Sequence, residues 1–267
     1  SAYSTEVSVT VKNGGKDVYA LSNGALIQRG GTKELPKFHW KLDAPHPSYL
    51  VTLVIGEFAR LEAKQGKLPL QYLVPKGREA DAEYTFRRTG EMVSLFETLL
   101  GTPFPWGSYS QVVVSDFIFG GMENTTATTL YEHTLLDERA RVDITSEDLI
   151  VHELAHQWFG DFVTCRSWSE GWLNEGFATY SEHLWRRHTE GLDAYQYGLR
   201  SDLDAYVGEA RGRYRRAIVC RSLVIRTRSS RAWSSAGPAE RCADGAGAAA
   251  AASATTSAGT TNSAASK

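Results

Sequence analysis

Apolar residues follow a two-residue period in the first quarter of the chain. Residues 6–11 alternate polar and apolar side chains, and residues 49–54 form a short apolar run, as strands do. Turn sequences at 13–15 and 23–24 separate such runs, and Pro69 to Pro75 has the pattern of a connecting strand. Residues 1–66 are therefore predicted to form a β-rich segment.

A helical period replaces the alternation further along. Residues 79–100 are predicted to form one helix whose core face is Met92, Leu95, Phe96 and Leu99. Two further helices are predicted at about 146–160 and 171–188. The second of these carries an apolar stripe of Leu173, Phe177, Tyr180 and Leu184. Strands followed by helices indicate the α+β class.

The helix predicted at 146–160 contains His-Glu-Leu-Ala-His at residues 152–156. His152 and His156 stand one helical turn apart, so two imidazoles can converge on one ion. A catalytic zinc site takes three protein ligands and leaves one position for water. Glu175 is the third ligand expected, with eighteen residues between it and the pentapeptide's second histidine, and Glu153 is placed to take a proton from the water. The simpler alternative is a helix with two surface histidines.

Residues 152–161 and 172–180, read together, closely resemble the zinc aminopeptidases typified by aminopeptidase N. The segment Gly120 to Asn124 (Gly-Gly-Met-Glu-Asn) is similar to that family's exopeptidase motif and lies upstream in the family's order. Residues 21–24, 38–40 and 47–50 look like the end of its N-terminal β domain. The resemblance covers roughly residues 1–221.

The resemblance implies an incomplete thermolysin-like catalytic domain at 67–221, after the C-terminal part of a β domain at 1–66. It implies one Zn²⁺ per chain, held by His152, His156 and Glu175, with Glu153 as the general base. The expected reaction is hydrolysis of the first peptide bond of peptides with a free N-terminus.

An enzyme of this kind must recognise an α-ammonium, and a carboxylate close to the metal does so through charge-assisted hydrogen bonds. Glu123 is the residue expected to hold the ammonium. Gly121 and Met122 are expected to contact substrate through backbone groups, because glycine lets a backbone approach and pair like an added strand. Asn124 is expected to support that loop.

Glu182 is expected to orient the metal ligands without binding the metal itself. It lies two turns beyond Glu175 on the same predicted helix face, where it could accept a hydrogen bond from a ligand histidine. The alternative is a solvated surface glutamate.

Composition limits the classes of binding partner that we expect. A formal charge of −2 gives no reason to expect nucleic acid or an anionic membrane surface. No run is long enough for a membrane span, and no signal peptide is visible, which favours the cytoplasm while leaving the compartment open. Three widely spaced cysteines make neither a disulfide framework nor a thiolate metal site.

The segment 222–267 differs from everything before it. It is arginine-rich, then an Ala, Ser, Thr and Gly tract from Gly245 to Ser266, a composition that predicts disorder. We favour a shifted reading frame over a genuine linker, and, because the chain starts in mid-pattern with Ser1, expect a fragment. The family's oxyanion-donating tyrosine would fall about sixty residues beyond Glu175, yet no tyrosine follows Tyr214.

These departures keep alternatives open. The chain could be a catalytically impaired zinc-binding fragment, or a related bifunctional epoxide hydrolase and aminopeptidase. A thermolysin-type endopeptidase is disfavoured, because it has no reason to place a carboxylate at the amine position.

Overall fold

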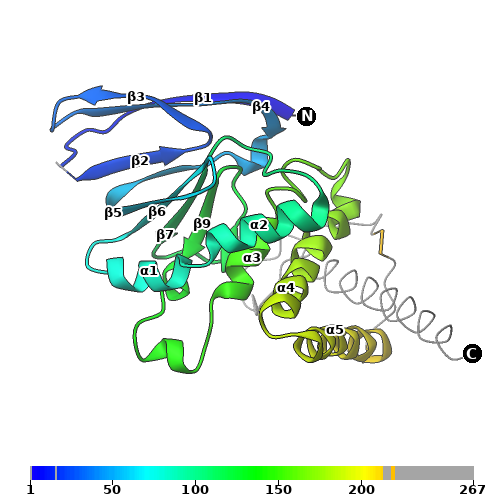
Figure 1. Cartoon of the computed structure of the whole chain (residues 1–267). Coiled ribbons are helices and arrows are strands. Elements are labelled where there is room, and N and C mark those ends of the chain that lie inside the picture. The colour runs from blue at the N-terminus through cyan, green and yellow to red at the C-terminus, as the bar shows by residue number, and fades with distance from the viewer. Residues whose placement is uncertain (1, 16, 213–217, 220–267) are drawn as a thin grey trace, which may run out of the picture. The chain divides into compact units, whose positions relative to one another are not determined.

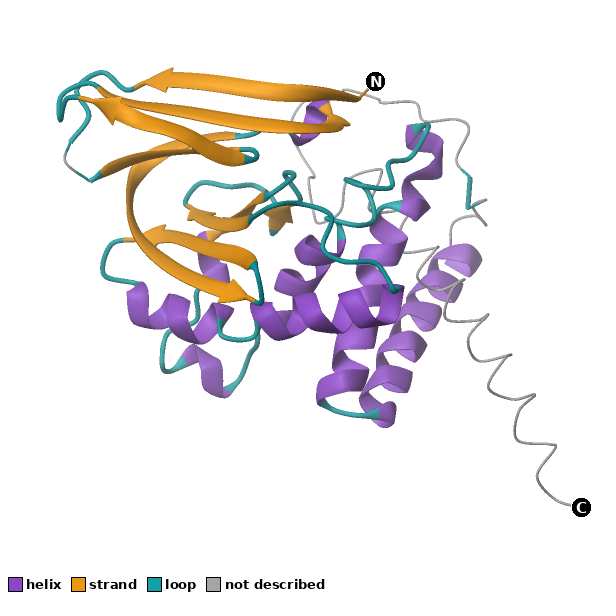
Figure 2. Ribbon diagram, turned by 45° about the horizontal axis from the view of Figure 1, so that its top comes forward, coloured by secondary structure: helices purple, strands orange, loops and turns teal. Residues whose placement is uncertain are grey.

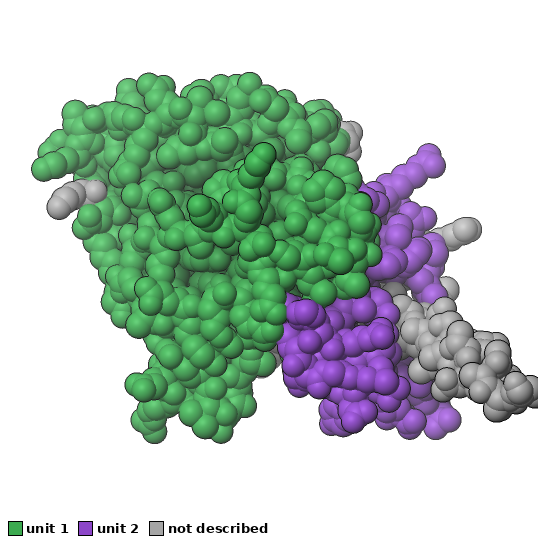
Figure 3. Space-filling view, viewed as in Figure 1, with its two compact units in different colours: residues 1–162 green, residues 163–267 purple. Residues whose placement is uncertain are grey.

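The computed structural model describes residues 2–15, 17–212 and 218–219. The predicted tail at 222–267 lies outside these residues, as do Cys220 and Cys242. The described chain falls into two compact units, the first ending at Phe162 and the second beginning at Val163 (Figure 3). Among the described residues, no helix has both the length and the apolar content needed to cross a membrane.

Two β-sheets form the frame of the first unit (Figure 1). A three-stranded antiparallel sheet has the order β1–β4–β3, and its strands are β1 (Ala2–Thr10), β4 (Pro36–Pro47) and β3 (Ala25–Gly31). A six-stranded mixed sheet has the order β2–β5–β6–β7–β9–β8. Its strands are β2 (Val18–Ser22), β5 (Leu53–Gln65), β6 (Leu68–Pro75), β7 (Tyr109–Val114), β9 (Ala127–Tyr131) and β8 (Gly121–Met122).

An apolar cluster packs the two sheets together. Tyr19 of β2 lies edge-on to Phe38 and Trp40 of β4, with ring centroids 5.3 and 6.2 Å away. Leu73, Val112 and Ala127 extend the cluster across the six-stranded sheet. Aromatic rings of this size bury much apolar area, so the inward-facing positions of the strands fix which faces meet.

Helices cover the six-stranded sheet on the side away from the three-stranded sheet (Figure 2). They are α1 (Glu79–Phe86), α2 (Thr89–Leu100) and α3 (Glu147–Ala155). The first unit also has short 3₁₀ turns, at Ser48–Leu50, Glu132–Thr134 and Ala140–Val142. The second unit contains a 3₁₀ segment at Trp168–Leu173, then α4 (Glu175–Thr189) and α5 (Leu192–Gly212). The mixture of sheet and helix confirms the α+β class.

The single helix predicted at 79–100 is wrong, because the chain turns at Arg87 and Arg88 between α1 and α2. The turn lets both guanidinium groups reach one carboxylate, that of Glu147 at the start of α3, over 2.8 and 3.1 Å. The predicted core face also needs correction. Met92 and Phe96 are buried, but Leu99 is 51% exposed, and Val93 is buried instead.

Other predicted bounds shift in the same way. The strand expected at 49–54 is a 3₁₀ turn followed by β5, and the helix expected from 171 begins at Glu175 after a 3₁₀ segment. The long helix α5 was not predicted at all. Tyr180 and Leu184 of the predicted stripe pack against Tyr195 and Leu199 of α5, within the second unit.

The domain boundary predicted after residue 66 stays a prediction. Strand β5 ends at Gln65 and pairs with β6 through eight residues in antiparallel register, and β6 in turn pairs with β7. The six-stranded sheet therefore contains strands from both sides of that boundary.

Candidate metal centre

Helix α3 carries both histidines of the pentapeptide. It begins after Ser146, with Glu147 and Asp148 in its first turn, where acidic side chains complement the helix dipole. His152 lies in the last turn, and His156 is the residue that ends the helix. Their ring centroids are 4.7 Å apart, as the helical spacing predicts.

His156 is held in the form that a metal ion requires. Its Nδ1 lies 3.0 Å from the carbonyl oxygen of Phe159, in the turn that follows the helix. A carbonyl oxygen can only accept, so Nδ1 carries a proton, and in the neutral ring Nε2 keeps its lone pair. A backbone bond of this kind fixes the ring of a ligand histidine, and the side chain therefore fits a metal.

Three buried side chains converge beside this histidine. A carboxylate oxygen of Glu123, one of Glu153 and a ring nitrogen of His156 all lie within 4.8 Å of one another. Glu153 is 5% exposed, Glu123 6% and His156 1%. Carboxylates this close and this buried are stabilised by a cation among them, so the donor set suits a metal ion or an ammonium group.

Gly121 makes room for one of these carboxylates. A Cβ built on Gly121 would overlap Oε1 of Glu153, whereas a Cβ on Gly120 would meet only the flexible end of Leu149 at 3.3 Å. Helix α3 and strand β8 can therefore approach this closely only because residue 121 has no side chain.

Strand β8, which contains Gly121 and Met122, is one of the two edge strands of the six-stranded sheet. It pairs with β9 on one side, where Met122 is opposite Thr129. Glu123 and Asn124 follow directly in the loop to β9. An edge strand that ends in a buried carboxylate is the arrangement expected for a strand-like substrate with a positive end.

Asn124 makes its side-chain bonds within the protein. Its Nδ2 donates to the carbonyl of Leu50 over 3.3 Å, and its Oδ1 accepts from the hydroxyl of Thr129 over 2.9 Å. The loop after β8 is thus tied both to the 3₁₀ turn at residue 50 and to its own partner strand.

The other two predicted residues belong to the second unit. Glu175 is the first residue of α4, and Glu182 lies two turns along the same helix. Both side chains are partly exposed. Their predicted roles rest on sequence spacing and stay predictions.

Two residues near the site were not singled out from the sequence. Asp161 is 2% exposed, and burial raises the pKa of its carboxyl well above the ordinary range, with the Glu123 carboxylate adding to the rise and His156 opposing it. Gln157 is fully buried and bonds to the loop after β8. Both lie within five residues of His156, and their polar character in an otherwise apolar stretch was the signal available.

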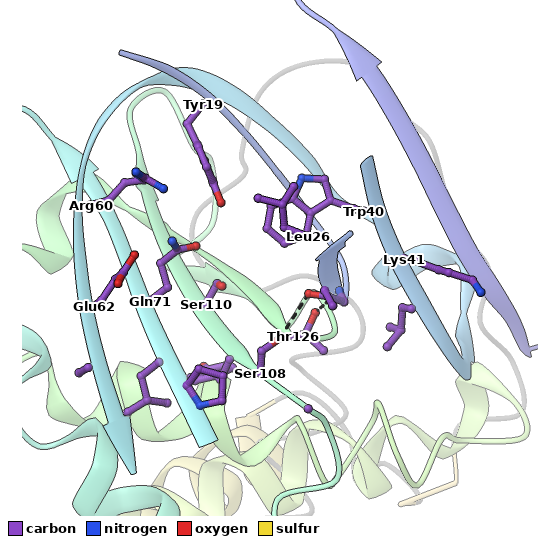
Figure 4. Close-up of a pocket in the computed structure, with 18 residues that line it drawn as sticks. Tyr19, Leu26, Trp40, Lys41, Arg60, Glu62, Gln71, Ser108, Ser110 and Thr126 are labelled. Carbon is purple, nitrogen blue, oxygen red and sulfur yellow. Dashed lines mark hydrogen bonds between the residues drawn. The ribbon is translucent and has the colours of Figure 1, made fainter. Parts of the chain in front are cut away.

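A separate cavity of about 630 Å³ lies in the same unit, between the two sheets (Figure 4). Tyr19, Trp40, Arg60 and Glu62 are among its lining residues, and the described residues around it include none of the predicted site residues. Of the loop after β8, only Thr126 lines this cavity.

Comparison with known proteins agrees with the motifs. Residues 84–211 match the sequence model of the peptidase family M1 domain. Aminopeptidase Ey of Gallus gallus is 38% identical over 146 residues, which are 51% of this chain and 15% of the relative. Aminopeptidase N of Homo sapiens is 34% identical over 188 residues, covering 66% of this chain and 19% of the relative. A probable aminopeptidase 2 of Sulfurisphaera tokodaii is 32% identical over 174 residues, covering 63% of this chain and 22% of the relative.

The chain thus spans less than a quarter of the length of each of these relatives. The matched region contains the predicted metal ligands and both carboxylates of the buried cluster. The resemblance indicated by the two motifs is confirmed, and residues 84–211 of this chain belong to peptidase family M1.

Proposed function

We propose that this chain carries the zinc centre and the amine-binding carboxylate of an aminopeptidase. The observation that supports this most directly is the buried group of Glu123, Glu153 and His156, because it places a second carboxylate beside the proposed general base, where a substrate ammonium would need a charged partner. We propose His152, His156 and Glu175 as the zinc ligands, within a thermolysin-like catalytic portion at 67–221.

Zinc, when bound, supplies a Lewis acid that polarises a carbonyl group and lowers the pKa of water. The carboxylate of Glu153 then has a defined task. It accepts the proton of the attacking water and returns it to the nitrogen of the leaving peptide, as a general base and then a general acid. Gly121 keeps this carboxylate against strand β8, where the scissile bond of a strand-like substrate would lie.

Glu123 performs a different task. Its carboxylate accepts hydrogen bonds from the α-ammonium of the substrate, so that only the first peptide bond reaches Glu153. Backbone groups of Gly121 and Met122 align the substrate along the sheet edge, and Asn124 fixes the loop through Leu50 and Thr129. In this proposal, the substrates are peptides with a free N-terminus.

Metal analysis of purified variants tests the proposal. We expect one zinc ion per chain in the wild type and in Glu153→Gln, since the proposal gives Glu153 the role of general base and not of ligand, and loss of zinc in His156→Ala. His133→Ala, which removes an exposed histidine of the same unit, is the matched control and should retain zinc. Stoichiometric zinc in His156→Ala would exclude this site.

Glu123 is tested with a pair of ligands rather than by metal content. Glu123→Gln should keep zinc but lose the preference for free over N-acetylated peptides by about 10²-fold or more, because an ammonium loses its charged partner. Glu138→Gln, at an exposed position, is the control. Equal binding of both peptides by the wild type would favour an endopeptidase instead.

A further inference from the structure

A buried glutamine spans the loop that carries Glu123. The side chain of Gln157 donates from Nε2 to the carbonyl oxygen of Glu123 over 3.2 Å, and its Oε1 accepts from the backbone N–H of Thr126 over 2.9 Å. It therefore holds both ends of the four-residue loop with one planar group. Gln157 is fully buried and directly follows His156.

The glutamine is itself held in place. The indole N–H of Trp106 donates to the carbonyl of Gln157 over 3.1 Å, and the N–H of Gln157 donates to Leu154 of α3 over 3.0 Å. Because its backbone is bonded at both polar groups, the side chain of Gln157 extends to the loop from a fixed point at the end of α3.

Thr126 gives an independent sign that this loop is constrained. Its φ of 65° lies in the left-handed region, which costs free energy for a β-branched residue. Three bonds maintain it: from Thr126 N–H to Gln157, from the N–H of Gly24 to its Oγ1 over 2.6 Å, and from the N–H of Ser110 to its carbonyl over 2.8 Å. Figure 4 shows the bond between Thr126 and Gly24.

A second buried amide also holds the loop. Asn23, at the turn between β2 and β3, donates from Nδ2 to the carbonyls of Thr125 and Leu50 over 2.6 and 3.0 Å. Its Oδ1 accepts from the N–H of Thr52 over 2.8 Å. The loop after β8 is thus fastened both to the N-terminal strands and to the end of α3.

We propose that Gln157 is a positioning residue that fixes the Glu123 carboxylate relative to His156, and so sets the preference for substrates with a free α-ammonium. The proposal rests on the proposed function. Its physical basis is that His156 and Gln157 are adjacent, so one rigid peptide unit links a proposed metal ligand to the loop of the amine site. A misplacement of about 1 Å in such a site costs on the order of 10²-fold.

The test uses Gln157→Met, which keeps the length and volume of the side chain but can neither donate nor accept as an amide does. Gln111→Met is the matched control: Gln111 is also fully buried in the first unit, but its Nε2 bonds to Thr89 instead. Any general loss of packing or stability affects both variants. The two differ in their contact with the Glu123 loop.

Affinity is measured on the zinc-loaded full chain with leucine hydroxamate and N-acetyl-leucine hydroxamate. The hydroxamate group chelates the metal equally in both ligands, so the ratio of their affinities isolates the contribution of the amine. We expect Gln157→Met to lower this ratio by about tenfold or more while zinc affinity changes little, and Gln111→Met to leave the ratio unchanged.

Backbone hydrogen exchange gives a second readout that does not depend on ligand. The amide of Thr126 should exchange at least about tenfold faster in Gln157→Met than in Gln111→Met. Gln157→Glu serves if the methionine variant does not fold, because its carboxylate still accepts from Thr126 but, when ionised, cannot donate to Glu123. Its ratio of free-amine to N-acetyl affinity should lie below that of the wild type. Where Gln157→Met can also be measured, the ratio should lie between the two.

The outcomes are distinct. A wild-type preference for the free amine that Gln157→Met retains would overturn this inference alone. A wild-type chain that binds both hydroxamates equally would overturn the amine-binding function, and this inference with it. An equal drop in Gln111→Met would assign the effect to packing and overturn the positioning role.

Discussion

At the scale of single residues, the candidate site depends on a position without a side chain. Gly121 lies where a Cβ would overlap the carboxylate of Glu153, although the neighbouring Gly120 has room for one. The sequence shows two adjacent glycines and no difference between them. Only residue 121 must lack a side chain, because α3 approaches strand β8 there. That approach is a contact between segments far apart in the sequence.

We predict that Gly121→Ala impairs the site and Gly120→Ala does not. The added methyl at residue 121 must displace the Glu153 carboxylate or the strand, which should lower the free energy of unfolding by about 1–3 kcal/mol and reduce peptide hydrolysis at least about tenfold. Gly120→Ala should stay within about 0.5 kcal/mol of the wild type. Denaturant unfolding and an amino-acid anilide assay on both variants decide it, and equal behaviour of the two would contradict the packing described.

At the scale of secondary structure, local spacing proved sufficient for the histidines and insufficient for the helices around them. His152 and His156 converge because helical geometry alone places residues four apart on one face. At the break between α1 and α2, Arg87 and Arg88 pair with Glu147, about sixty residues away. No window of the sequence around residue 87 contains that partner.

The same distinction applies to the core. Met92 and Phe96 are buried as the helical period predicts, but the exposure of Leu99 depends on what α2 packs against. The contacts of Gln157 with Glu123 and Thr126 join residues more than thirty positions apart. Nothing in their local sequence indicates these contacts, so this part of the site could be found only in three dimensions.

Helix α5 gives a prediction about packing in the second unit. Gly198 lies against His183 of α4, whose Nε2 bonds to Asp202 over 2.7 Å, and a Cβ at 198 would come within 2.5 Å of the His183 Nδ1. Gly208, ten residues along the same helix, has no atom within 4 Å of such a Cβ.

Gly198→Ala should therefore destabilise the chain by about 1–3 kcal/mol, because the ring of His183 must move and its bond to Asp202 with it. Gly208→Ala should stabilise it by about 0.5–1 kcal/mol, since alanine is the better helix former and meets no obstacle. Urea unfolding followed by circular dichroism measures both. The prediction fails if the two substitutions shift stability in the same direction.

At the scale of the whole molecule, the proposed zinc ligands come from both compact units. His152 and His156 belong to the unit that ends at Phe162, and Glu175 begins α4 of the unit that follows. The assignment of Glu175 rests on its spacing from the pentapeptide and on the family. Metal binding therefore offers a test of that assignment that is independent of the geometry within either unit.

Zinc should raise the thermal stability of this chain, and each proposed ligand should be needed for the effect. A ligand that binds only the folded state adds about 4 kcal/mol at a free concentration near one thousand times its Kd, which corresponds to a rise in Tm of about 5–15 °C for a chain of this size. We expect this rise, measured between excess chelator and buffered zinc, in the wild type and in Glu153→Gln.

Glu175→Ala and His156→Ala should each lose most of that rise, because two remaining ligands bind zinc far more weakly than three. His133→Ala, which alters a histidine outside the site, should keep it. A full zinc-induced rise in Glu175→Ala would mean that the third ligand is another residue, and the carboxylate of Glu123, already within 4.8 Å of the Glu153 and His156 donors, would be the first alternative to test.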